Sequence, residues 1–328
     1  MLRRRHLWVL VGLLFSAVFT WAALHNTDAG AVTESLAGAS GSWTLAFLAM
    51  LATFCVVKAI RWGQLLSNIE HANMRRLLPP VLIGYFGTAI MPMQLGEVFR
   101  AHSAARRLGM PFMTLLSSLA VERIFDVFGL VSLVAVLILY DSAAGDALWY
   151  AGMLMALGSL ILLFVLVLAV TRPEKLHAFV RLCTGFAGDK LSDSITAHLD
   201  AALEGMAVLK QPSRFIRLLV LSIGQWILMW GCVWASLFAV DVTVSATAAL
   251  AVLAAAVIGM MLPSGPAYIG TFQLAFVLTL APFGVAKDEA LAASLFYQIM
   301  LWVPLSIAGI FSLRKTDLEV GRMIATED

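Results

Sequence analysis

The sequence predicts an all-α polytopic membrane protein with six spanning helices, two re-entrant helical hairpins and an inverted repeat. Of its 328 residues, 61% are hydrophobic and 13% are charged, whereas soluble domains carry roughly 25% charged residues. Runs near the ~20 apolar residues that a transmembrane helix needs occur at 7–24, 43–60, 112–140, 148–170, 215–240 and 290–313. So much apolar surface excludes a water-soluble fold.

Two further apolar stretches are each interrupted by a proline. The first breaks at Pro92 and the second at Pro263, and a second apolar arm follows each break. Backbone can leave the helix at bilayer depth only where protein or a water-filled cavity satisfies its polar groups. Paired interruptions, one in each half of the chain, are typical of a transporter's substrate site. We therefore expect hairpins at residues 80–107 and 245–282.

The positions of Lys and Arg predict the topology, because cytoplasmic loops collect these residues. If the basic N-terminus is cytoplasmic and the chain turns back near Pro92, then Arg106 and Arg107 also stay inside. On this path the first hairpin dips in from the cytoplasmic side and the second from the outer side. Of the 22 Lys and Arg, only Arg123 and Lys287 then lie away from the cytoplasm. We expect both termini to be cytoplasmic and the first span to remain uncleaved.

The order of elements predicts a single membrane domain built from two inverted repeats. Gly109 stands 13 residues before Glu122, and Gly284 stands 13 residues before Tyr297, which is a weak echo between the halves. The longest polar stretch is too short for a core of its own and has the periodicity of an amphipathic surface helix. The expected parts are residues 1–146, residues 147–328 and a cytoplasmic linker at 174–214.

Three charged residues, Glu122, Arg123 and Asp126, lie near the middle of the predicted span 112–140. A charge at a helix centre costs about 2.5–3.5 kcal/mol even on the mildest scale, so these groups should pair, face a cavity, or both. Helical geometry places Glu122 and Asp126 on one face, with Arg123 three residues from Asp126. Glu97 and Arg100 are i, i+3 neighbours on the returning arm of the first hairpin.

These charges have a functional and a structural interpretation. The functional one is a polar cleft that admits an anionic lipid headgroup, because the guanidinium fork of arginine binds phosphate through two hydrogen bonds and hairpin tips add free amides at helix ends. The structural one is a set of ion pairs that pins a hairpin to its neighbour. Lys58 and Arg61 could contact substrate or simply anchor the end of a span. The candidate substrate-binding residues are Arg123, Arg100, Glu97, Glu122, Asp126, Arg61, Pro92, Gly96, Pro263, Ser264, Gly270 and Gln273.

No catalytic, metal or cofactor site is expected. The three cysteines have no metal-ligand spacing and form no disulfide framework, and every histidine lies outside the apolar spans. The sequence has no phosphate-binding glycine loop, no nucleophile elbow and no nucleic-acid module. The expected partners are membrane lipids.

Four short segments resemble the flippase-like membrane domain family, which forms the transmembrane portion of bacterial lysylphosphatidylglycerol synthases. They are PMQLGEVFR at 92–100, ERIFD at 122–126, LPSGPAYIGTFQ at 262–273 and FGV at 283–285. The resemblance covers roughly residues 10–315. It implies a lipid-moving membrane domain, as in stand-alone members linked to hopanoid export and polyprenyl-linked glycan assembly.

The sequence departs from the family pattern in two ways. The family's second motif is often richer in glycine and ends in glutamate, whereas Ala267, Tyr268 and Gln273 stand here, which argues against a protonatable role for Gln273. The chain also stops soon after Ile310, so the resemblance implies that the soluble aminoacyl-transferase domain is missing.

The favoured hypothesis is therefore a flippase that moves an anionic phospholipid or a polyprenyl-phosphate-linked lipid between leaflets of the bacterial inner membrane. The alternative is a non-transporting accessory subunit that scaffolds a lipid or glycan biosynthesis enzyme. An intramembrane enzyme acting on a lipid headgroup is a third hypothesis, and no nucleophile or metal set supports it.

Overall fold

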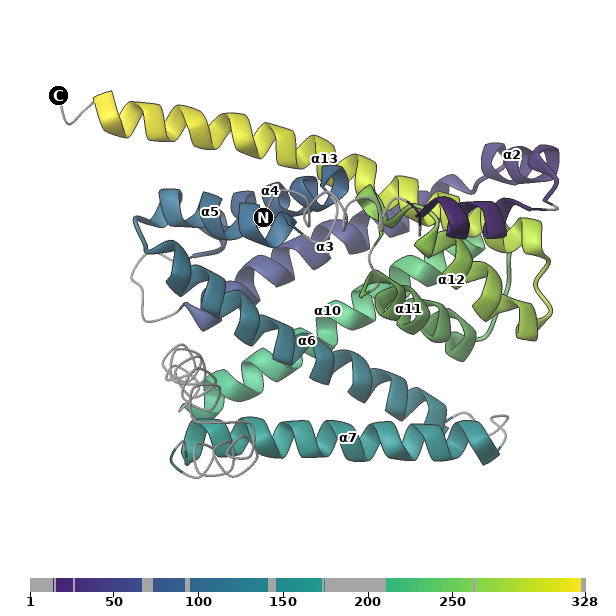
Figure 1. Ribbon diagram of the computed structural model, residues 1–328, viewed down its shortest axis with the longest axis horizontal. Helices are drawn as coiled ribbons and strands as arrows, with labels where there is room; N and C mark the ends of the chain where they lie inside the picture. The colour runs from purple at the N-terminus through teal and green to yellow at the C-terminus, as the bar shows by residue number, and fades with distance from the viewer. Residues whose placement is uncertain are drawn as a thin grey trace. The chain divides into compact units, whose positions relative to one another are not determined.

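The protein is helical throughout the part that the structure, a computed structural model, describes (Figure 1). The described residues are 14, 16–25, 27–66, 73–91, 95–140, 146–172, 174, 211–261 and 264–325. The helices are α2 (Ala29–Ala37), α3 (Gly41–Leu65), α4 (Met74–Ile90), α5 (Gly96–Leu108), α6 (Phe112–Tyr140), α7 (Asp146–Thr171), α10 (Pro212–Ala239), α11 (Ala246–Met260), α12 (Thr271–Leu280) and α13 (Lys287–Ala325). Short 3-10 turns occupy Pro266–Tyr268 and Ala281–Phe283. Residues 16–24 are also helical.

Four helical stretches among the described residues are long and apolar enough to cross a membrane: Gly41–Leu65, Pro212–Ala239, Pro266–Phe283 and Lys287–Arg314. Helices α6 and α7 have 29 and 26 residues, which also exceeds the length that a span requires. The protein is thus a multi-pass membrane protein. The predicted count of six spans plus two hairpins stays a prediction.

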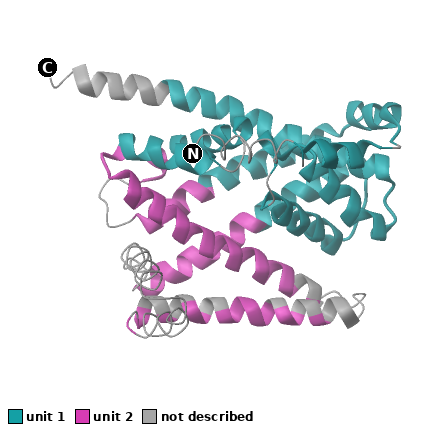
Figure 2. Ribbon diagram, viewed as in Figure 1, with its two compact units in different colours: residues 1–56, 78–107, 227–328 teal, residues 57–77, 108–226 magenta. Residues whose placement is uncertain are grey.

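The chain divides into two compact units, coloured separately in Figure 2. Unit 1 comprises residues 1–56, 78–107 and 227–328, and unit 2 comprises residues 57–77 and 108–226. Each unit draws on both predicted repeats, and helices α3 and α10 each contribute to both units. The repeat boundaries at 1–146 and 147–328 remain a prediction about topology.

Within unit 1, α4 and α5 form an antiparallel helical hairpin with very close backbones. A Cβ atom added at Gly84 would lie 2.8 Å from Cβ of Arg100, and one added at Gly87 would lie 3.1 Å from Cα of Gly96. The contacts run in opposite directions along the two helices, so the chain reverses between Met91 and Leu95. Glycines permit this approach because they have no side chain. Pro92, the predicted break, lies outside the described residues.

A second pair of short helices in unit 1, α11 and α12, pack against one another, and α12 also contacts α13. Helix α11 has 15 residues and α12 has 10, lengths of roughly 22 and 15 Å at 1.5 Å per residue. Each helix alone is shorter than the ~30 Å hydrocarbon core, although α12 and its two flanking 3-10 turns together make up the longer apolar stretch Pro266–Phe283. Gly259 on α11 faces Thr271 on α12, which places the reversal between these residues. Pro263 lies outside the described residues.

Unit 2 contains the long antiparallel neighbours α6 and α7, which pack against one another. The buried indole Nε1 of Trp62 donates to Ser118 Oγ at 2.9 Å, which ties the end of α3 to α6. Phe125 and Phe215 make an edge contact at 5.9 Å between ring centroids, which packs α6 against α10. The predicted linker at 174–214 lies outside the described residues except for its two ends.

Candidate functional site

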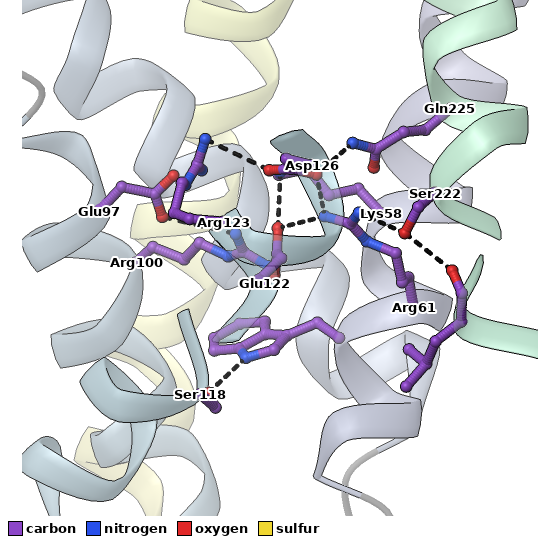
Figure 3. Close-up of polar contacts among 12 residues, drawn as sticks. Lys58, Arg61, Glu97, Arg100, Ser118, Glu122, Arg123, Asp126, Ser222 and Gln225 are labelled. Carbon is purple, nitrogen blue, oxygen red and sulfur yellow. Dashed lines mark hydrogen bonds and ion pairs between the residues drawn. The ribbon is translucent and has the colours of Figure 1, made fainter. Parts of the chain in front are cut away.

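The charged centre of α6 is buried in unit 2 (Figure 3). Glu122 is fully buried and Asp126 is 5% exposed. They are one helical turn apart, so both point to the same side of α6. The sequence prediction that these carboxylates share a face agrees with this geometry. Two buried carboxylates in an apolar helix require cations or hydrogen-bond donors close by.

Two cations from the end of α3 meet these carboxylates. Lys58 Nζ lies 2.7 Å from Glu122 Oε1. Arg61 Nη2 lies 3.0 Å from the same oxygen and 2.6 Å from Asp126 Oδ1. Both cations are buried, so neither extends toward the membrane surface as the anchoring interpretation required. Lys58 and Arg61 are adjacent because they stand three residues apart on one helix face.

Helix α10 completes the site with neutral donors and an acceptor. Gln225 Nε2 donates to Asp126 Oδ1 at 2.6 Å, and Trp226 Nε1 donates to the Asp126 carbonyl at 2.8 Å. Arg61 Nη1 donates to Ser222 Oγ at 2.9 Å. The helices approach closely because Gly129 of α6 lies against Ser222 and Trp226. Asp126 is therefore held from three helices.

Arg123 occupies a different position from its neighbours. Its guanidinium lies 3.3 Å from Asp126 Oδ2, but its side chain is 50% exposed. Its place within the predicted span 112–140 stays a prediction, and the structure adds that its side chain is far more exposed than those of Glu122 and Asp126. Residues next to one another in an α-helix point about 100° apart, so Arg123 must leave the face that Glu122 and Asp126 share.

The charged residues of α3 and α6 form one cluster of ion pairs. In the described part of unit 2, the ion pairs join three cationic groups to two carboxylates: Lys58, Arg61 and Arg123 with Glu122 and Asp126. We call these five residues the α6 charge cluster. Among these five residues, Arg123 has by far the most exposed side chain.

The remaining predicted charges lie in unit 1. Glu97 and Arg100 form the expected i, i+3 pair on α5, with Arg100 Nη1 3.5 Å from Glu97 Oε2. Arg100 is buried, and its Cβ packs over Gly84 of α4. Gly96 begins α5 at the closest point of the hairpin.

The predicted residues of the second hairpin form a separate neutral network. Gln273 Oε1 accepts from the amide of Gly270 at 2.7 Å. Gln273 Nε2 donates to Gln298 Oε1, and Gln298 Nε2 donates to the carbonyl of Ala267 at 2.9 Å. Ser264 is buried in the same loop. The structure thus joins Gly270 and Gln273, whereas Pro263 lies outside the described residues.

Sequence reasoning missed three polar residues that the structure adds: Ser222, Gln225 and Gln298. Gln225 and Ser222 are i, i+3 neighbours in an apolar helix, and this spacing was the available signal. Neutral polar side chains are tolerated in spans and bond across helices, so their presence alone does not point to a site. Among the described residues, no group of three or more His, Cys, Asp and Glu could hold a metal ion.

Comparison with known proteins identifies the family. Residues 9–309 match the lysylphosphatidylglycerol synthase transmembrane region. A curated relative is the glycosyltransferase AglD of Haloferax volcanii, which is 20% identical over 346 aligned positions. That alignment covers 96% of this chain and 55% of AglD, so the chain spans about half the length of this relative. The chain belongs to the family of the lysylphosphatidylglycerol synthase transmembrane region.

Proposed function

We propose that the protein transports a lipid between the leaflets of a bacterial inner membrane, and that the lipid is an anionic phospholipid or a polyprenyl-phosphate-linked lipid. The observation that carries the proposal is the half-exposed guanidinium of Arg123, which lies 3.3 Å from the buried carboxylate of Asp126 on a helix long enough to span a membrane. A charged side chain within a span is costly, so a guanidinium that extends from the buried ion pairs is a candidate for binding an anionic headgroup.

A phosphate group would suit the guanidinium of Arg123. The exposed guanidinium of Arg123 presents planar N–H donors, which suit a phosphate diester or monoester through paired hydrogen bonds. Behind it, Asp126 orients the guanidinium at 3.3 Å, while Arg61 and Lys58 prevent the two carboxylates from repelling the anion. Charged residues within spans are typical of substrate pathways.

The short helix pairs support transport over a purely structural role. We infer that α4–α5 and α11–α12 are re-entrant hairpins from opposite sides of the membrane, since α5 and α11 have 13 and 15 residues and fall short of a span. Interrupted helices of this kind mark substrate sites in transporters built from inverted repeats. In this proposal both termini are cytoplasmic, and the chain itself catalyses no reaction.

Leaflet exchange tests the proposal directly. Purified protein is reconstituted into phosphatidylcholine vesicles that contain trace fluorescent phosphatidylglycerol, fluorescent phosphatidylcholine or a fluorescent polyprenyl phosphate. Quenching from outside then measures the exchange rate. We expect faster exchange of at least one of the two anionic lipids and no change for phosphatidylcholine. Exchange no faster than in protein-free vesicles for both anionic lipids would refute transport.

One observation favours a second candidate function. The AglD relative is named a glycosyltransferase and is considerably longer than the aligned region, which is compatible with a membrane part that serves a neighbouring enzyme. The alternative is therefore an accessory subunit that scaffolds a lipid or glycan biosynthesis enzyme. A scaffold should co-purify with such an enzyme at a fixed ratio, and its loss should lower that enzyme's level in the membrane without changing lipid exchange in vesicles.

A further inference from the structure

The second hairpin contains no charged group at all. Residues 242–286, which include α11 and α12, have no Asp, Glu, Lys, Arg or His. The second helices of the two short pairs differ in charge. Helix α5 has Glu97 in its first turn, whereas α12 has no acidic residue there. The positive end of the α12 dipole, equivalent to about half an elementary charge, is therefore not offset by a carboxylate of its own first turn.

The loop before α12 is held in an unusual conformation. Ala267 and Tyr268 have positive φ angles of 52° and 57°, although neither is glycine. Ser16 Oγ donates to the carbonyl of Ile269 at 2.7 Å and accepts from the amide of Gly265 at 2.8 Å, so it fixes both ends of the loop. Strained backbone persists only where surrounding contacts determine it, and such positions concentrate at binding sites.

Two buried donors next to this loop have no hydrogen-bond partner in the described part of the chain. They are Oγ1 of Thr271, the first residue of α12, and Nε1 of Trp302 on α13. Thr271 is 3% exposed and Trp302 is 8% exposed. The Trp302 ring stacks near Tyr268 of the loop, with 6.1 Å between ring centroids. An indole N–H can only donate, and native structures rarely leave a buried donor without an acceptor.

We infer that the N-terminus of α12 is a second phosphate-binding site, formed by the first-turn amides, the Thr271 hydroxyl and the Trp302 indole. The first N–H groups of a helix have no intrahelical acceptor and are a common anion site. Donors without nearby carboxylates select a group that only accepts hydrogen bonds, and the oxyanion of a phosphate is such a group. The inference rests on the proposed function only in assigning the phosphate to a lipid headgroup.

This site differs from the α6 charge cluster in how it binds. The cluster would bind an anion through the guanidinium of Arg123, while the α12 site holds it through dipoles and hydrogen bonds. The Gln273–Gln298 pair contributes here by fixing Gly270 and Ala267 without adding charge. A carboxylate at position 273 would repel a phosphate, so the glutamine is suited to the site.

The indole resonance of Trp302 reports on this site directly. The full chain, labelled with ¹⁵N-tryptophan, is placed in phosphatidylcholine nanodiscs, and Trp302→Phe identifies the resonance among the nine tryptophans. One arm adds inorganic phosphate, a second replaces part of the lipid with phosphatidylglycerol, and a third adds glycerol. We expect a saturable shift with phosphatidylglycerol, and a shift with inorganic phosphate as well if the site accepts the free anion.

Thr271→Val removes one donor while keeping the shape of the side chain. We expect binding at Trp302 to weaken about tenfold, the amount expected for one hydrogen bond to a charged group. Thr53→Val is the matched control, since the Thr53 hydroxyl is exposed and bonds only within α3, to the Ala49 carbonyl; its binding should equal that of the wild type.

Three results would overturn the inference: no shift with either phosphate source, an equal shift with glycerol, or unchanged binding in Thr271→Val. The first two results are measured on the wild-type protein, so the inference can be refuted even if the Thr271→Val variant fails to fold. Leaflet exchange separates this inference from the proposed function. If the protein exchanges phosphatidylglycerol between leaflets but the Trp302 resonance does not shift, the proposed transport stands and the second site is refuted.

Discussion

Arg61 and Asp126 form a buried ion pair, with 2.6 Å between Arg61 Nη2 and Asp126 Oδ1. The Arg61 side chain is fully buried and that of Asp126 is 7% exposed. Because Arg61 belongs to α3 and Asp126 to α6, the pair joins these two helices. Gln225 of α10 donates to the same Asp126 oxygen. A buried pair of this kind holds its helices together strongly only while both partners are present.

Arg61→Met should strongly destabilise the protein. The substitution keeps an unbranched apolar side chain but removes the cation that contacts both carboxylates, and breaking a buried pair typically costs about 3–5 kcal/mol. We expect a clear fall in the temperature at which the purified protein loses its monodisperse peak in size-exclusion chromatography.

The double variant Arg61→Met/Asp126→Asn supplies the control for this prediction. In the double variant no buried carboxylate is left at position 126 without its cation. The asparagine side-chain oxygen can still accept the hydrogen bond from Gln225. The double variant should therefore recover at least half of the lost thermal stability. If the single variant is as stable as the wild type, the pair does not hold the helices together as described here.

Arg123→Ala should leave the fold intact and abolish most of the transport. The Arg123 side chain is half exposed, so its pairing with Asp126 contributes little to stability. Its loss should nevertheless slow leaflet exchange of the anionic lipid at least tenfold, and Arg123→Lys should restore only part of the rate because an ammonium lacks the planar fork. Stopped-flow quenching in vesicles measures both.

A matched arginine on the same protein distinguishes this effect from a general loss of charge. Arg217 of α10 is exposed and bonds to Gln64 at 3.4 Å, outside the α6 charge cluster. Arg217→Ala should exchange lipid at the wild-type rate. Equal rates for Arg123→Ala and the wild type would remove Arg123 from the substrate site.

The charge cluster shows how far the sequence alone could lead. Glu122 and Asp126 were recognisable because a carboxylate within a long apolar run is costly and must be compensated. Lys58 and Arg61 were ambiguous, since a basic residue at the end of a span either snorkels to the surface or turns inward. Only the packing of α3 against α6 decides between these, and a single sequence carries no signal for that packing.

The helices themselves were largely predictable, because apolar runs of the right length dictate them. The predicted spans 43–60, 112–140 and 215–240 lie within or nearly coincide with α3, α6 and α10. The division into two units could not be foreseen, since α3 and α10 each pass from one unit to the other. Sequence order suggests consecutive repeats, whereas compactness depends on contacts between distant segments.

Gly96→Ala should destabilise the α4–α5 hairpin. A Cβ atom at this position would lie 2.6 Å from the backbone nitrogen of Thr88, and closer still to the Thr88 hydroxyl and the Gly84 carbonyl. Because two of these atoms belong to the α4 backbone, the helices must separate, at a cost of about 1–3 kcal/mol for overpacking. Thermal unfolding of the purified protein measures this loss.

Gly158→Ala is the corresponding control in α7. An added Cβ atom there meets nothing within 4 Å, and alanine is the better helix former by about 0.8–1.0 kcal/mol. This variant should be at least as stable as the wild type. If Gly96→Ala and Gly158→Ala unfold at the same temperature, the close approach of α4 and α5 does not constrain the fold.

Single cysteines at the ends of the two short helix pairs should be labelled from opposite sides of the membrane. Arg106 near the end of α5 and Ala286 after α12 are both exposed. Each is changed to cysteine in a protein whose three native cysteines have been removed, so that it is the single labelling site. If both pairs are re-entrant, Arg106→Cys reacts with an impermeant maleimide only from the cytoplasm and Ala286→Cys only from outside. The contrast arises because a hairpin returns to the side from which it entered. A first pair that crossed the membrane once would bring Arg106→Cys to the outer surface, where it would react in intact cells, and the inverted arrangement of the two hairpins would then be wrong.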